Sequence, residues 1–86
     1  MPLISSFYGI DIKIYFKDHF PAYFHAYYGE HSVEIVISDL SVLAGHLPRR
    51  AMVLVKEWAE LHRRELEDDW EEARAGRPLS RIEPLP

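Results

Sequence analysis

The stretch YFHAYYGEHSVEIVIS, residues 23 to 38, predicts a β-hairpin. Two runs rich in aromatic and β-branched residues flank Gly29-Glu30, and glycine at the first central position suits a two-residue type II′ turn. That turn sets a register in which one face of the hairpin is apolar and the other polar, and a slip of one residue would mix the two faces. The predicted pairs are Phe24 with Ile35 and Ala26 with Val33 on the apolar face, and His25 with Glu34 and Tyr27 with Ser32 on the polar face.

Further strands are predicted on both sides of this hairpin. Residues 10–16 alternate between apolar and polar side chains, the period of a strand with one buried face. Residues 4–8 are predicted to pair with them, with Gly9 at the turn or bulge between the two strands. Pro21 breaks the pattern that follows, because it cannot donate to a central ladder. Beyond the hairpin, residues 38–41 predict a turn and residues 42–44 a short last strand that ends at Gly45.

From Pro48 the apolar period changes to that of a helix. Pro48 suits a first helical turn, and Ala75-Gly76 followed by a proline is a stop signal. The sequence therefore predicts one long helix over residues 48–75, with a kink near residues 66–68, and an extended tail over residues 77–86. The apolar stripe, with spacings of three and four, consists of Ala51, Leu54, Val55, Trp58 and Leu61.

An acidic run inside this helix leaves alternatives open. Six of the eight residues from 65 to 72 are Asp or Glu, and carboxylates near a helix C-terminus oppose its dipole. If the helix instead breaks near Leu66, Asp68 would cap a second short helix, with Glu71 three residues later. Such a run is usually a solvated face, and the alternatives are contact with a basic partner or mimicry of nucleic acid.

The predicted fold class is α+β, in one domain of residues 1–86. An antiparallel β-meander of about four to five strands occupies residues 1–46, and the long C-terminal amphipathic helix packs on one of its faces. The chain has no cysteine, no signal-peptide pattern and no apolar run long enough for a membrane span, so we expect a cytoplasmic protein that uses no membrane. A net charge of −4 makes it a poor general binder of nucleic acid.

Three motifs together resemble a small bacterial family catalogued as domain of unknown function 4160. They are DHFPAYFHA at residues 18–26, LPRRA at residues 47–51 and EWAELH at residues 57–62. The chain departs from the family pattern Pro-His-Phe-His, because Tyr23 stands where the family has the first histidine. The resemblance implies two-gene cassettes, in which such a gene lies beside another short open reading frame, sometimes in a toxin–antitoxin-like arrangement.

The first functional hypothesis is a protein-binding or regulatory component of such a system. Its partner would be a second small protein encoded nearby, or a second copy of this chain. Trp70 must either reach back over the sheet or meet another protein, and tryptophan is favoured at interface hot spots. The residues predicted to bind the partner, with the open sheet edge in addition, are Trp70, Tyr27, Leu79 and Ile82.

The second hypothesis is the toxin of such a system, an RNase-like enzyme that works without a metal. His25 would be the base, oriented by Glu34 across the hairpin, and His19 or Tyr23 would supply the acid. Arg49 or Arg50 would hold the phosphate, so RNA is a partner only under this hypothesis.

No metal site and no cofactor are predicted. Asp18, His19, His25 and His31 are the candidate ligands, but His25 and His31 fall on opposite faces of the predicted hairpin. Tyr23 also replaces the histidine that could have completed a site.

Overall fold

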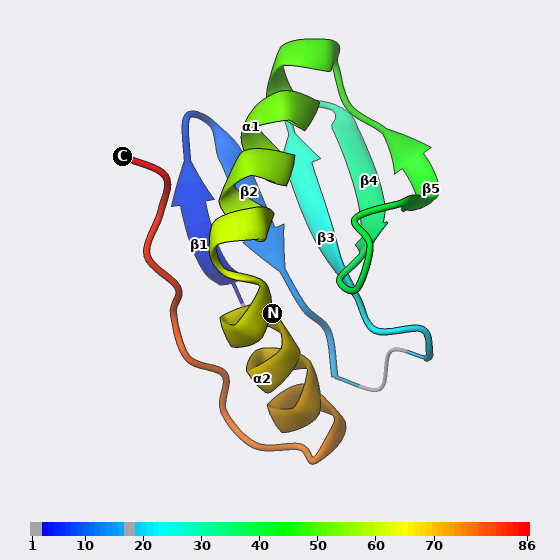
Figure 1. Cartoon of the computed structure of the whole chain (residues 1–86), viewed down its shortest axis with the longest axis vertical. Coiled ribbons are helices and arrows are strands. Elements are labelled where there is room, and N and C mark those ends of the chain that lie inside the picture. Colours follow the sequence, from blue (N-terminus) through cyan, green and yellow to red (C-terminus); the bar gives the residue numbers. More distant parts are fainter. Residues whose placement is uncertain (1–2, 17–18) are drawn as a thin grey trace.

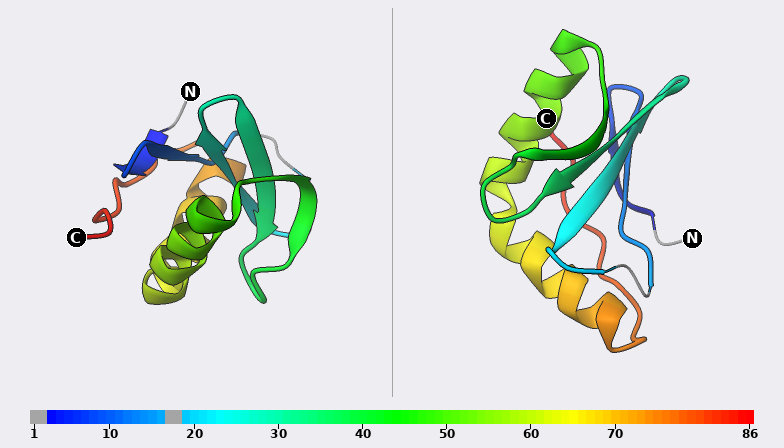
Figure 2. Two further views of the ribbon diagram at one scale, coloured as in Figure 1. Left: turned by 90° about the horizontal axis from the view of Figure 1, so that it is seen from above. Right: turned by 90° about the vertical axis from the view of Figure 1, so that its right-hand side faces the viewer.

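The computed structural model describes residues 3–16 and 19–86 as a five-stranded sheet with two helices (Figure 1). The strands are antiparallel neighbours in chain order, so the sheet is a meander. Both helices lie on the same face of the sheet (Figure 2), which confirms the α+β class. The elements are β1 (Leu3–Phe7), β2 (Ile10–Lys13), β3 (Tyr23–Tyr28), β4 (His31–Val36), β5 (Val42–His46), α1 (Arg49–Leu61) and α2 (Arg63–Arg74).

The predicted hairpin register is confirmed in β3 and β4. Gly29 has φ +59°, the left-handed region that the first position of a type II′ turn requires. All four predicted pairs are present, and the apolar ones point into the core that the helices cover. The polar members of these pairs are therefore presented on the opposite, uncovered face of the sheet.

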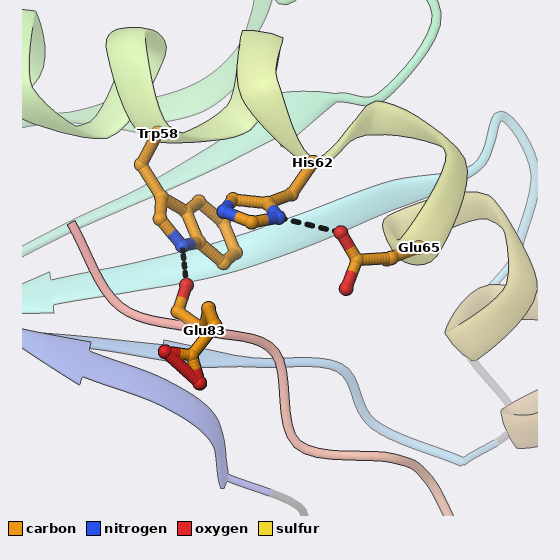
Figure 3. A network of polar contacts seen from close by, with 4 residues as sticks. All are labelled: Trp58, His62, Glu65 and Glu83. Carbon is orange, nitrogen blue, oxygen red and sulfur yellow. Dashed lines mark hydrogen bonds and ion pairs between the residues drawn. The ribbon is translucent and has the colours of Figure 1, made fainter.

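The single long helix is wrong, because the helix breaks at His62, four residues before the expected kink. His62 has φ −123° and ψ 26°, and its N–H donates to the carbonyl oxygens of both Trp58 and Ala59. Its Nδ1 lies 2.5 Å from Oε1 of Glu65 in the first turn of α2 (Figure 3). The buried stripe continues across the break, from Trp58 and Ala59 in α1 to Leu66 in α2.

The apolar stripe predicted for this helix is only partly buried. Ala51, Val55 and Trp58 are buried as expected, whereas Leu54 is half-buried and Leu61 is 66% exposed. In α2 the buried side chains are Leu66, Asp69, Trp70 and Ala73, at the spacing of one helix face.

The C-terminal tail, residues 77–86, runs beside β1 along the left edge of the sheet (Figure 1). The N–H of Ile82 donates to the Ile4 carbonyl at 2.7 Å, and the indole N–H of Trp58 donates to the Glu83 carbonyl at 2.8 Å (Figure 3). Tyr8 also donates from its hydroxyl to the Pro86 carbonyl at 2.5 Å. The tail therefore covers the β1 edge, and Ile82 becomes part of the core.

None of the helices within the described residues has the length and apolar character needed to cross a membrane.

Candidate functional site

The uncovered face of the sheet carries two rows of polar side chains that cross β2, β3 and β4. The first row is Lys13, His25 and Glu34, which are direct neighbours in the strand register. The second row is Asp11, Tyr27 and Ser32. Because side chains alternate between faces, each strand supplies every second residue to this surface.

Aromatic rings pack around His25 on this face. The ring of Tyr15 meets the His25 imidazole edge-on with centroids 4.5 Å apart, and the hydroxyls of Tyr15 and Tyr27 are 2.6 Å apart. Lys13 places its Nζ 5.2 Å from the centroid of the Tyr27 ring, a cation–π contact. These contacts leave the His25 side chain only 13% exposed.

Glu34 lies beside His25 but is not hydrogen-bonded to it. Nδ1 of His25 is 4.0 Å from Oε2 of Glu34, longer than a hydrogen bond and within the range of an ion pair when the imidazole is charged. The predicted partnership of these two residues is therefore an electrostatic one, across the β3–β4 ladder.

His19 and Tyr23 extend the ring cluster toward the end of the sheet. The ring centroids are 5.6 Å apart between His19 and Tyr23 and 5.2 Å apart between Tyr23 and His25. Tyr23 is 3% exposed and packs on Trp70, whereas His19 is exposed, with its Nδ1 3.1 Å from the Phe20 carbonyl oxygen. Of the two residues predicted to act as the general acid, His19 and Tyr23, only His19 is exposed to solvent.

Arg49 and Arg50 do not join this cluster. Both are exposed in the first turn of α1, which lies on the covered side of the sheet. Arg50 lines a hollow of about 260 Å³ with Tyr8, Tyr28 and Leu54, and that hollow shares no lining residue with the one beside His25. Among the described residues, Lys13 is the cation paired with His25 in the strand register. The sequence did not predict this, because no turn signal sets the β2–β3 register.

Two of the four predicted partner-binding residues are inside the protein. Trp70 is 2% exposed and packs on Phe20 and Tyr23, with centroids 6.0 and 5.6 Å away, so it reaches back over the sheet. Ile82 is 4% exposed, and Leu79 and Tyr27 are half-buried. In this structure Trp70 and Ile82 are core side chains and present no surface to a partner, which corrects the expectation for these two residues.

The outer edge of β5 is uncovered. All five residues of this strand are exposed, and they include Val42 at 47% and Leu43 at 40% exposure. The strand VLAGH carries no Lys, Arg, Asp or Glu and no proline, the residues that usually block strand addition at an edge. The sheet thus has one edge covered by the tail and one edge free.

No three His, Asp or Glu side chains in residues 3–16 and 19–86 are placed to hold a metal ion. His31 lies against His46, with ring centroids 5.4 Å apart, away from the His25 cluster. Asp18, one of the candidate ligands, lies outside the described residues.

Comparison with known proteins gives one match. The family described as Domain of unknown function (DUF4160) matches residues 9–71, which run from the β1–β2 turn into α2 and include both polar rows of the uncovered face. No curated protein and no solved structure is significantly similar to the chain. Because the match covers well over half of its residues, the chain belongs to the DUF4160 family.

Proposed function

We propose that this protein is the protein-binding component of a two-protein, toxin–antitoxin-like system, and that its partner adds a strand to the free edge of β5. The observation that carries the proposal is the contrast between the two edges of the sheet. The tail covers β1, whereas every residue of β5 is exposed and none is charged in the manner that blocks pairing.

Strand addition fits this edge physically. An edge strand presents a row of unpaired N–H and C=O groups, and an extended partner segment can satisfy them while apolar side chains supply burial. Val42 and Leu43 provide exposed apolar surface at this edge. The partner would be the small protein encoded beside the gene, or a second copy of this chain paired through its own β5.

Replacement of Leu43 by lysine should weaken the complex about tenfold or more, because an unpaired charge would then face the incoming strand. The affinity is measured by calorimetry with the product of the adjacent open reading frame, and self-association by sedimentation. Val53→Lys is the matched control, since Val53 is a similarly exposed apolar residue, at 57%, on the outer surface of α1. Equal affinities for the two variants would rule out the β5 edge as the contact.

A second candidate function is metal-independent cleavage of RNA, supported by the row of Lys13, His25 and Glu34 across three strands. His25 would take the proton of the ribose 2′-hydroxyl as its oxygen attacks phosphorus, and His19 would protonate the leaving 5′-oxygen. Lys13 would stabilise the phosphorane charge in the place first assigned to Arg49 or Arg50.

Under this candidate, His25→Ala should lower the rate of RNA cleavage at least about 100-fold, the usual contribution of a general base. The rate is measured on single-stranded RNA with the purified chain, alongside growth of a bacterial host after induction. His31→Ala is the control, because His31 is exposed and lies away from the His25 cluster. Equal rates for wild type and His25→Ala would exclude the enzymatic candidate.

A further inference from the structure

A hollow of about 380 Å³ lies between α2 and the C-terminal tail. Its lining is strongly acidic, with five carboxylates against one guanidinium. The lining residues are Glu65, Asp68, Asp69, Glu71, Glu72, Ser80, Arg81 and Ile82. The tail forms one wall, so the hollow exists only because residues 77–86 pack back on the domain.

The cations of the chain neutralise only part of this charge. Glu65 is paired with His62, and Glu72 accepts a hydrogen bond from Arg77 at 2.5 Å. Arg81, the one cation in the lining, makes no ion pair with any residue in the described part of the chain. The hollow therefore keeps an excess of negative charge that nothing in the described chain offsets.

Asp69 is the member of this lining that an ordinary solvated face does not explain. It is 2% exposed, and its Oδ1 accepts the Ser80 N–H at 2.9 Å. Its Oδ2 is buried and has no hydrogen-bond partner among the described residues. Burial raises the pKa of the Asp69 carboxyl, and the neighbouring carboxylates of Asp68, Glu65 and Glu72 raise it further.

A buried carboxylate oxygen without a donor is costly, and an incoming cationic donor would remove that cost. A bare metal ion fits poorly, because no three carboxylates of the described chain converge to ligand distance. An organic cation on a flexible stem is better suited, since its methylenes can lie along Ile82 while its charge reaches the carboxylates. Guanidinium also offers several donors in a planar fork that matches carboxylates.

We propose that the hollow between α2 and the tail is a docking site for a basic segment of a partner protein, with one arginine side chain entering beside Asp69. This contact is distinct from strand addition at β5, which lies across the sheet from the tail (Figure 1), so either can fail without the other. The site would recognise an extended segment that contains arginine, and apolar side chains in that segment would not be needed.

The test uses a blocked heptapeptide of alternating glycine and arginine, with its lysine and citrulline counterparts, against the full chain in calorimetry. The arginine peptide should bind, the lysine peptide should bind more weakly and the citrulline peptide should not bind. Asp69→Asn should weaken the arginine complex about tenfold, as expected for loss of a charge-assisted hydrogen bond. Asp68→Asn combined with Glu71→Gln should also weaken it, which covers the case in which Asp69→Asn fails to fold.

Glu67→Gln is the matched control, because Glu67 is exposed on the same helix, carries the same charge and does not line the hollow. Its affinity should stay within about twofold of wild type, since long-range surface charge contributes little in salt. Equal losses for Asp69→Asn and Glu67→Gln would mean unspecific attraction to an acidic helix and would overturn the proposal. Absence of binding by wild type would do the same.

Thermal unfolding without peptide separates recognition from a structural role. Asparagine keeps the Oδ1 acceptor for Ser80 and removes the buried charge, so Asp69→Asn should raise Tm at pH 7 while it weakens binding. As the pH falls and Asp69 takes up a proton, the difference in Tm between the variant and the wild type should disappear. The reason is that burial, which raises the pKa of Asp69, destabilises only the ionised carboxylate. A lower Tm together with unchanged affinity would assign Asp69 to the fold alone and reject the site.

Discussion

Trp58→Ala should destabilise the protein by about 3 to 5 kcal/mol. Trp58 is fully buried, and its indole contacts Phe7 and Phe24, with ring centroids 5.4 and 6.0 Å away. Its indole thus links α1 both to the sheet and to the C-terminal tail, because its N–H donates to the Glu83 carbonyl. A domain of this size has a total stability of roughly 4 to 13 kcal/mol, so this single side chain is a large share of it.

The measurement is urea unfolding followed by circular dichroism. Trp58→Phe should cost less than the alanine change, because the ring is kept and only the bond to Glu83 and part of the volume are lost. Val53→Ala on the exposed side of α1 should stay within about 0.5 kcal/mol. A loss below about 1 kcal/mol for Trp58→Ala would contradict the packing of α1 and the tail described above.

Gly45→Ala should cost about 3 kcal/mol or more, although only one methyl group is added. Gly45 has φ +78°, where a side chain is strained, and a Cβ there would lie 2.3 Å from the carbonyl oxygen of Ser32 in β4. The backbone of β4 or β5 would have to move to admit it, so the edge strand should loosen first.

Gly76→Ala is the matched control, since Gly76 has a nearly equal φ of +74° and nothing within 4 Å of the added Cβ. It should cost about 1 kcal/mol from backbone strain alone, and the difference between the two variants isolates the clash with Ser32. Urea unfolding of both variants provides the comparison. Equal losses would show that β5 does not approach β4 as closely as the structure has it.

The hairpin of β3 and β4 was predictable in full because its signals are local. Alternation of polarity decided which side chains share a face, and Gly29 set the turn, so the pairing of His25 with Glu34 followed from adjacent residues. The register of β2 with β3 was not predictable, because the sequence between the two strands contains no two-residue turn signal that would set it. Lys13 was therefore missed as the neighbour of His25.

The helix break was hidden for a different reason. His62 is compatible with a helix by propensity, and nothing local in the sequence marks its departure from helical angles. The acidic run indicated a kink or break near residues 66–68, but the sequence did not place it at His62. Trp70 lies on the buried face of α2, four residues after Leu66, so whether it met the sheet or a partner could not be judged before the tertiary structure was known.

The unequal edges of the sheet limit how this protein can assemble. A subunit with two free edges can be extended indefinitely, and that is the geometry of a fibre. Here the tail covers the sheet at β1, so among the described strands only β5 offers an edge for pairing. Two chains joined through their β5 strands would have no further edge to offer, so the C-terminal segment limits self-assembly to a pair.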